Sequence, residues 1–384
     1  MTTTSLPPPN HAAYLTSLNA HPLTIEETAD RYPNENELVI RVHAIAINQI
    51  DWKMQDEPWT DFKYPLILGV DVAGVVVHAG SEVNDNNRAE EGLHQFAVGD
   101  CVAGHALRFA TGDDRHAGFQ EYAVLWNNMT TVIPAGMPFE RAAVLPLGVS
   151  TASAALFQRA PAGMGLELPT LDQKLRDRVS ATRAAVLVWG ATSSVGSNAV
   201  QMAVAAGYDV IATASRGNFE TVRRRLGARV VIDYTSKGED IVKQIREALA
   251  GGGHLVGIFD AIGAKGSLGP IFKIFEADPS ISGVKTVHTT GYVEEGWELA
   301  VPDGLKVQSI QAIDIRGEEG DDRAETVGWK IYRDFLPKAL EAGKYKVYPE
   351  PVLGGEGLRS IQAALETSKT SRKGKVVVTI KSYE

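Results

Sequence analysis

The chain has 384 residues, of which 44% are hydrophobic and 22% are charged, and its formal net charge is −9. This composition is typical of a globular protein of about two domains. The negative charge argues against binding to nucleic acid or an anionic membrane through bulk electrostatics. No apolar run approaches the length of a membrane span, so we expect neither a nucleic-acid partner nor a membrane partner.

The N-terminal stretch MTTTSLPPPN lacks the basic and apolar regions of a signal peptide. It is expected to be an unstructured lead. The single cysteine, Cys101, rules out an intramolecular disulfide and fits a reducing compartment. The predicted location is therefore cytoplasmic.

Short strands dominate roughly the first 150 residues. Alternating or continuous apolar residues predict strands at Ala12–Leu15, Leu38–His43, Tyr64–Gly69, Val70–His78, Cys101–Gly104 and Gly118–Leu125. The segment Ala44–Lys53 starts apolar and ends polar, which favours a strand that delivers side chains to a cleft. The polar and acidic stretch Ser81–Gln95 is predicted to be an exposed loop.

Strands and helices alternate in the second part of the chain. Ala142–Gln158 indicates a helix, a proline break and a second helix that links two domains, and Pro161–Arg183 is predicted to be a surface loop. Strands are then predicted at Ala185–Trp189, Tyr208–Ala214, Arg229–Ile232, Leu255–Asp260, Val284–Thr289 and Ile310–Ile315. Intervening helices are predicted at Ala199–Ala206, Asn218–Leu226 and Glu239–Ala250. This alternation favours a parallel, doubly wound sheet.

The C-terminal part is expected to rejoin the strand-rich domain. It holds two predicted helices and a final strand, Thr326–Ala342, Gly357–Thr367 and Val376–Ile380. The predicted fold class is α/β, with a β-rich domain of residues 1–150 completed by 317–384, and a dinucleotide-binding domain of residues 151–316.

The turn after the strand Ala185–Trp189 carries the clearest chemical signal. A dinucleotide-binding turn must bring backbone N–H groups and a helix N-terminus to a pyrophosphate. Here the usual glycine fingerprint is replaced by Ala191, Ser193 and Gly196, so an ordinary strand-to-helix turn stays open as an alternative. The predicted cofactor-binding residues of the turn are Ala191, Thr192, Ser193, Ser194, Val195 and Gly196.

The end of the second predicted strand indicates which nicotinamide cofactor is used. An NAD-specific fold places an acid about twenty residues past the glycines, whereas this chain has Ser215, Arg216 and Asn218 there. Arg216 can pair with a 2′-phosphate, or it can be an exposed arginine at a helix entry. Arg223–Arg225 are expected on a solvated face. Asp260 and Ala261 end the fourth strand, where ligands lie in open α/β sheets.

Several segments in order resemble one known superfamily. They are AIAINQIDWK, YPLILGVDVAGVVV, VGDCVAGH, FQEYAVL, AAVLPLGVSTA, VWGATSSVGSNAVQMA and GKVVVTI. The chain resembles the zinc-independent medium-chain dehydrogenase/reductases, in the fungal branch of CipB-like and ToxD-like proteins, which is related to trans-acting enoyl reductases and quinone oxidoreductases. The resemblance covers essentially the whole chain. It implies a GroES-like catalytic domain, a central Rossmann domain and a cleft that holds NADPH and substrate.

The resemblance also implies that the chain binds no metal. Zinc members carry Cys-His where this chain has Asn48 to Asp51, and Gly-His-Glu where it has Gly69-Val70-Asp71. Zinc sites need thiolate and imidazole ligands at fixed spacing, and the scattered histidines are expected to be structural or surface residues. Among the nine histidines of the chain they include His43, His78, His105 and His116. The absence of a Lewis acid would disfavour alcohol dehydrogenation and favour hydride addition to an activated double bond.

Candidate catalytic residues lie in two segments of the N-terminal domain. By resemblance, the segment of Asn48, Asp51 and Lys53 faces the nicotinamide ribose, although Asp51 and Lys53 can instead form a structural ion pair. Tyr64 and Trp59 are further contact candidates. No side chain is identified as the proton donor, and water can suffice.

Three further groups complete the predicted site. The resemblance places Tyr234 near the adenine, with a core aromatic as the alternative. Gln120 and Tyr122 stay open as cleft residues. The substrate and nicotinamide side is expected to be lined by Pro146, Leu147, Gly148, Val149, Ser150 and Thr151, with helix packing between domains as the alternative.

The predicted function is an NADPH-dependent oxidoreductase that transfers a hydride to an activated C=C bond. The substrate class is an enone, a quinone or an enoyl thioester, either free or on a polyketide synthase carrier domain. Two alternatives stay open: an NADPH-binding partner or sensor protein with little turnover, and a zinc-free carbonyl or alcohol oxidoreductase. The protein is expected to be a monomer or a homodimer, and the sequence does not identify the substrate.

Overall fold

The computed structural model describes residues 9–29, 31–58, 62–84, 93–277, 283–291, 299–318, 321–371 and 374–381. The chain forms two compact units. Unit 1 holds Met1–Leu147, Tyr332–Glu341 and Pro349–Glu384, and unit 2 holds Gly148–Ile331 and Ala342–Tyr348. Relative to the predicted domain bounds, residues 148–150, 317–331 and 342–348 group with unit 2. No helix in the described ranges is both long and apolar enough to cross a bilayer.

Unit 1 is built on two β-sheets, one of order β15-β16-β3-β5-β6-β8 with β7 paired to β3, the other of order β2-β1-β4. Its strands are β1 Asn10–Leu15, β2 Thr24–Thr28, β3 Glu37–Ala46, β4 Leu66–Ile67, β5 Asp71–Ala79, β6 Cys101–His105, β7 Tyr122–Trp126, β8 Thr130–Val132, β15 Pro351–Glu356 and β16 Lys375–Thr379. Its helices are α1 Gln49–Asp56, α2 Arg108–Thr111, α3 Phe139–Ala142, α10 Leu336–Glu341 and α11 Ile361–Thr370, with 3-10 turns η2 Asp114–His116, η3 Asn127–Met129 and η10 Leu358–Ser360.

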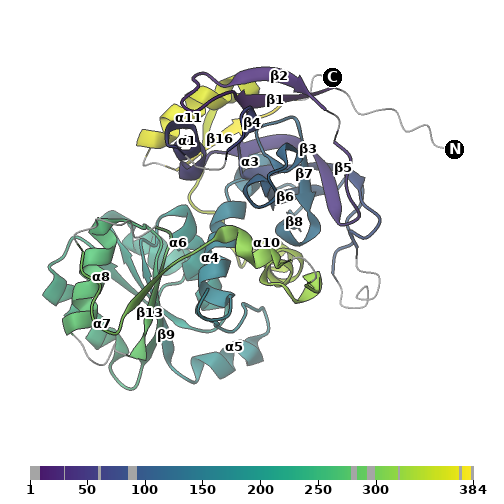
Figure 1. Cartoon of the computed structure of the whole chain (residues 1–384). Helices are drawn as coiled ribbons and strands as arrows, with labels where there is room; N and C mark the ends of the chain where they lie inside the picture. Colours follow the sequence, from purple (N-terminus) through teal and green to yellow (C-terminus); the bar gives the residue numbers. More distant parts are fainter. Residues whose placement is uncertain are drawn as a thin grey trace. The chain divides into compact units, whose positions relative to one another are not determined.

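Unit 2 is organised around a parallel sheet of order β11-β10-β9-β12-β13-β14, so the predicted doubly wound sheet is confirmed. Figure 1 labels β9 and β13 of this sheet. Its strands are β9 Ala184–Trp189, β10 Asp209–Ala214, β11 Val230–Asp233, β12 His254–Asp260, β13 Thr286–Thr289 and β14 Lys306–Ser309. Its helices are α5 Gln173–Ser180, α6 Ser194–Ala205, α7 Gly238–Leu249, α8 Lys265–Ala277 and α9 Val327–Trp329. Shorter turns are η4 Arg216–Asn218, η5 Thr221–Arg225, η7 Ala312–Arg316 and η8 Arg323–Glu325. Helix α4 Pro146–Phe157 and turn η9 Lys330–Phe335 each begin in one unit and end in the other.

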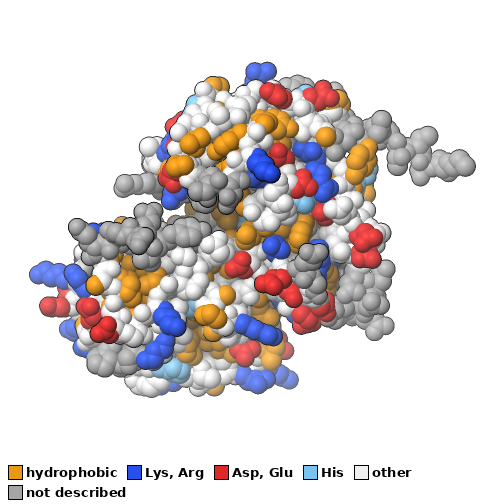
Figure 2. Space-filling view, in the orientation of Figure 1, with side chains coloured by type: hydrophobic (Ala, Val, Ile, Leu, Met, Phe, Trp, Pro, Cys, Tyr) orange, Lys and Arg blue, Asp and Glu red, His pale blue; other side chains and the backbone are white. Residues whose placement is uncertain are grey.

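Burial explains why this sheet forms around β9. All six residues of β9 are buried, as a central parallel strand covered on both faces requires. Helix α7 contributes its apolar stripe, including Ile241 and Ile245, to a core that it shares with α8 and the strands. On the face shown in Figure 2, acidic and basic side chains are interspersed over both units.

Three predicted elements are wrong. Ala44–Lys53 is not one strand, because β3 ends at Ala46 and α1 begins at Gln49, where the Asp51 carboxylate accepts the Asn48 N–H at 2.7 Å. The predicted loop 161–183 contains helix α5, which Asp172 caps through the Lys174 N–H. The sixth strand is β14 rather than Ile310–Ile315, because β13 ends at Thr289 and leaves later residues no strand to pair with.

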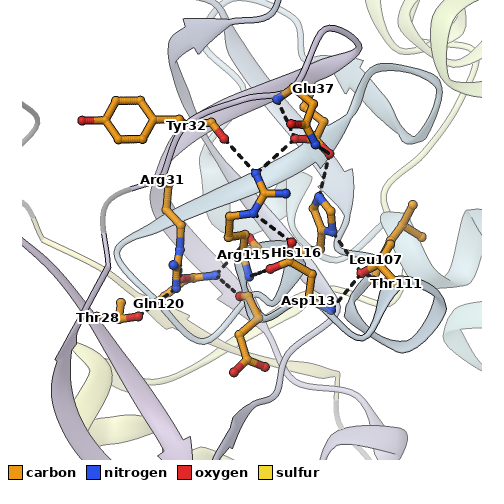
Figure 3. A network of polar contacts seen from close by, with 12 residues as sticks. Thr28, Arg31, Tyr32, Glu37, Leu107, Thr111, Asp113, Arg115, His116 and Gln120 are labelled. Atoms are coloured by element: carbon orange, nitrogen blue, oxygen red, sulfur yellow. Dashed lines mark hydrogen bonds and ion pairs between the residues drawn. The ribbon is translucent and has the colours of Figure 1, made fainter.

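A buried polar network in unit 1 joins the start of β3 to the segment 111–120 (Figure 3). Glu37 Oε1 lies 2.9 Å from His116 Nε2, and the other imidazole nitrogen lies 2.9 Å from Thr111 Oγ1. Gln120 is fully buried and accepts from Arg31 at 2.9 Å. His116 and Gln120 therefore serve the architecture of unit 1.

The network predicts a loss of stability in acid. Burial alone would raise the pKa of Glu37, but hydrogen bonds from His116 and Asn34 lower it to about 2. A depressed carboxyl pKa stabilises the fold above the unfolded-state value, and this stabilisation is lost as the pH falls from 4.5 toward 2. Glu37→Gln should cost about 1.5–3 kcal/mol of unfolding free energy near neutral pH. Urea unfolding at neutral pH and near pH 3 tests this, and an equal cost at both pH values would contradict it.

Candidate functional site

The predicted cofactor-binding residues lie in a tight turn that leads from the end of β9 to the N-terminus of α6. Gly190 has a φ of +83°, which glycine adopts without strain, and its N–H donates to Thr213 Oγ1 at 3.0 Å. Ser193 caps α6, because its Oγ accepts the Gly196 N–H at 2.9 Å. A Cβ on Gly196 would lie 2.2 Å from the Gly190 carbonyl oxygen. Helix α6 can therefore start close to the end of β9 only because residue 196 is glycine.

The first turn of α6 also contains a buried polar atom, the Ser194 Oγ. The Ser194 Oγ is buried and has no hydrogen-bond partner among the described residues. A Cβ on Gly148 would lie 2.8 Å from this oxygen and 2.6 Å from Asn198 Nδ2. The structure thus brings Gly148, from the predicted substrate segment, against Ser194. A buried hydroxyl beside a helix N-terminus fits a dinucleotide phosphate.

The residues predicted to select the cofactor lie together after β10 and β11. Arg216 Nε donates to Asp233 Oδ2 at 2.7 Å, while 83% of the Arg216 side chain is exposed. Asn218 Nδ2 donates to Ser215 Oγ at 2.9 Å. Tyr234 is 46% exposed, so it is not the core aromatic that the sequence left as an alternative.

Asp233 is a residue that sequence reasoning missed. It ends β11, its Oδ1 accepts both the N–H and the hydroxyl of Thr235, and its Oδ2 accepts from Arg216. Hydrogen bonds from Thr235 and then from Arg216 lower the pKa of Asp233. The available signal was an acid at the carboxyl end of a parallel strand, where ligands lie in such sheets.

Asp260 ends β12, as the sequence predicted, and its carboxylate is fully engaged within unit 2. Its side chain is fully buried, and burial raises its pKa. The carboxylate accepts hydrogen bonds from four groups: the Ile262 N–H, the Gly263 N–H, the Ser267 hydroxyl and the Thr289 hydroxyl. The Asp260 carboxylate thus fixes the turn after β12. Ala261, in the same turn, donates its N–H to the Trp189 carbonyl oxygen at 3.0 Å.

A second polar cluster lies in unit 1, where α1, β5 and β16 meet. Asp71 Oδ2 accepts from Asn48 Nδ2 at 2.9 Å and from the Lys375 ammonium. Asp71 Oδ1 accepts the Leu147 N–H at 2.6 Å. Asp51 is also fully buried, and burial raises its pKa to about 7. Sequence reasoning identified Asn48 and Asp51 but missed Lys375.

The remaining candidates are more dispersed. The predicted alternative of an Asp51–Lys53 ion pair is wrong, because the Lys53 Nζ lies 5.9 Å from the centre of the Trp52 ring and Asp51 binds the Asn48 N–H. Tyr64 packs against the core of unit 1, and Trp59 lies outside the described residues. In the predicted substrate segment all residues are buried except Leu147, which is half-buried: Pro146, Gly148, Val149, Ser150 and Thr151.

Two family models match the chain. One is the alcohol dehydrogenase GroES-like domain at residues 34–135, and the other is the zinc-binding dehydrogenase at residues 194–281. The zinc-binding alcohol dehydrogenase domain-containing protein cipB of Emericella nidulans is 36% identical over 97% of this chain and 98% of its own length. The chain belongs to the medium-chain dehydrogenase/reductase superfamily.

Other members of this superfamily extend the likeness. The trans-enoyl reductase himH of Aspergillus japonicus is 34% identical over 98% of both chains. The crystal structure of CurK enoyl reductase matches with a TM-score of 0.64 at 20% identity, over 97% of this chain and all of that one. The predicted GroES-like and Rossmann fold is confirmed, and as a member of this superfamily the protein is an oxidoreductase that uses a nicotinamide cofactor.

The zinc ion in the second family's name does not fit the residues found here. Both carboxylate oxygens of Asp71 are taken by hydrogen bonds and the Lys375 ammonium, and the Asn48 amide nitrogen is a donor that cannot bind a metal. Across the described ranges, no three His, Cys, Asp or Glu side chains are arranged to hold a metal. His105 is buried in unit 1 and, within the described part of the chain, belongs to no such group.

Proposed function

We propose that the protein is an NADPH-dependent reductase that adds a hydride to an activated C=C bond of an enone, a quinone or an enoyl thioester. The observation that carries this proposal is the buried Asp71–Lys375 pair, because the oxygens of Asp71 bind Lys375, Asn48 and the Leu147 N–H and are not free to hold a Lewis-acid metal. Without a Lewis acid to polarise it, the substrate must carry its own activating group, and a carbonyl next to the C=C bond supplies that activation. The names of relatives such as the trans-enoyl reductase himH support the same chemistry.

The chain's own residues would perform three tasks. The first turn of α6, with the Ser194 hydroxyl, would hold the pyrophosphate, and Arg216 would hold the 2′-phosphate. Small residues at 148–151 would let the nicotinamide and substrate approach closely. NADPH supplies the hydride, which goes to the β-carbon while the C=C electron pair moves to the carbonyl oxygen. Asp51 is fully buried, so we assign delivery of the proton to the α-carbon to water.

The test follows NADPH absorbance with four substrates: an enone, a quinone, an enoyl thioester and a saturated ketone. We expect consumption with one or more of the first three, none with the saturated ketone, and no effect of a chelator. Reduction of the saturated ketone alone would contradict the proposal. So would a stoichiometric zinc ion that a chelator removes together with the activity. Cofactor binding without turnover would favour an NADPH-binding partner or sensor.

The same assay separates a free substrate from a carrier-bound one. The enoyl group is offered once as a small thioester and once on a purified polyketide synthase carrier domain. We propose that the protein acts in trans, in the cytoplasm, on an enoyl group that is bound to a polyketide synthase carrier domain. This predicts a higher kcat/KM for the carrier-bound form of the substrate than for the small thioester. A lower value would assign it to free substrates.

A further inference from the structure

Lys375 places a positive charge deep inside unit 1. It is the first residue of β16 and only 6% of it is exposed. Its ammonium donates to Asp71 Oδ2 and to the carbonyl oxygen of Val144 at 3.1 Å. Burying a charge costs folding free energy unless the charge is paired and hydrogen-bonded. The contacts that offset this cost indicate what the Lys375 ammonium holds in place.

The contacts of this ion pair converge on one short turn. Lys375 binds the Val144 carbonyl, and Asp71 binds the Leu147 N–H at 2.6 Å. The turn lies between α3 and α4, and Leu147 is the second residue of α4, where a helical N–H has no partner within its own helix. Two backbone groups three residues apart are thereby held by charge-assisted bonds from β5 and β16.

A neighbouring acid makes a cation necessary at this place. Asn48 links the two acids, because its Nδ2 donates to Asp71 at 2.9 Å and its N–H donates to Asp51 at 2.7 Å. Asp51 is fully buried, and its Oδ1 has no hydrogen-bond partner among the described residues. Without the ammonium, the two buried carboxyl groups would have no positive charge among the described groups that bind them.

We propose that Lys375 is a positioning residue whose ammonium acts as a built-in cation that fixes the turn Val144–Leu147. The turn leads directly into residues 148–151. The catalytic consequence rests on the proposed function, which assigns this segment to the nicotinamide and substrate. The positioning itself does not depend on that assignment.

The first test measures amide hydrogen exchange at Leu147 in wild type, Lys375→Met and Lys375→Arg. Lys375→Met keeps the length of the side chain but removes its charge, and should speed exchange by about tenfold or more through loss of charge-assisted bonding. Lys375→Arg keeps a cation and should retain much of the protection. Unchanged exchange in Lys375→Met would overturn the proposal whether or not the enzyme reduces an enone.

A second variant separates positioning from simple charge burial. Lys375→Met with Asp71→Asn removes both charges, so the protein can fold even if Lys375→Met alone does not. If the cation positions the turn, this double variant should still exchange fast at Leu147 and show a lower kcat for the enone. NADPH affinity should stay within about twofold of wild type, because the phosphate contacts proposed at the first turn of α6 and at Arg216 involve neither of the substituted residues. Full recovery of protection and kcat in the double variant would show that only the unpaired charge mattered, and would overturn the proposal.

A third measurement uses chemical rescue. In Lys375→Ala the shortened side chain leaves room for a small amine, so added ethylammonium should slow Leu147 exchange again. Tetramethylammonium, which has no N–H to donate, should not. Equal effects of both cations would contradict a specific ammonium site.

Discussion

Gly196→Ala should weaken NADPH binding by about tenfold to a hundredfold. The added Cβ would lie 2.2 Å from the Gly190 carbonyl oxygen, so α6 must move away from β9. Overpacking of this kind costs about 1–3 kcal/mol, and each 1.4 kcal/mol is about tenfold in affinity. The movement also takes the helix N-terminus and the Ser194 hydroxyl away from the phosphates. Fluorescence titration of NADPH measures the change.

Gly238→Ala is the matched control for this substitution. Gly238 is the first residue of α7, and a Cβ there would meet nothing within 4 Å. Replacing a helical glycine by alanine normally stabilises by about 0.4–1 kcal/mol, so the control should bind NADPH as wild type does. If Gly196→Ala also binds as wild type does, the turn 190–196 is not the pyrophosphate site.

Arg216→Ala should remove most of the preference for NADPH over NADH. Hydrogen bonds to charged groups contribute about 1.5–3 kcal/mol, so wild type should favour NADPH by about tenfold to a hundredfold. The structure strengthens this expectation, because Asp233 holds Arg216 by its Nε at 2.7 Å and leaves the other guanidinium nitrogens for a phosphate. In Arg216→Ala the Asp233 carboxylate would remain and repel the phosphate. NADH binding should change little.

Two further variants sharpen the test of Arg216. Asp233→Asn keeps a hydrogen-bond acceptor but removes the charge, and should lower the NADPH preference by less than Arg216→Ala does. Arg224→Ala removes an equal charge from a side chain that already pairs with Glu220 at 3.2 Å, and should leave the preference nearly unchanged. If Arg216→Ala weakens both cofactors equally, the 2′-phosphate lies elsewhere, and Arg223–Arg225 are the next residues to vary.

Local signals account for what the sequence predicted correctly. Ser193 caps α6 through the Gly196 N–H, and Gly196 lets α6 start close to Gly190 at the end of β9. These contacts join residues a few positions apart, so the local sequence is enough to predict them. The parallel pairing in unit 2 was predicted from the alternation of strands and helices, which a parallel sheet requires. The predicted strand Ala44–Lys53 was wrong for a reason that is also local. Asn48 is a residue type that favours the N-cap of a helix, and α1 begins directly after it.

Long-range pairing accounts for what the sequence could not show. Asp71 and Lys375 are 304 positions apart, and Lys375 stands among apolar residues of a strand, where nothing local indicates a buried ion pair. Arg216 and Asp233 are 17 positions apart on the ends of adjacent strands, so their contact depends on the register of β10 against β11. Each pairing is set by the sheet rather than by the residues beside it.

The most direct test of the proposed reaction follows a label. NADPH that carries deuterium at the transferred position of the nicotinamide is incubated with the protein and the enone that it consumes fastest. Hydride addition to the activated double bond should leave one deuterium per product molecule, on the β-carbon, with the carbonyl retained. Deuterium on the former carbonyl carbon, in an alcohol product, would contradict it.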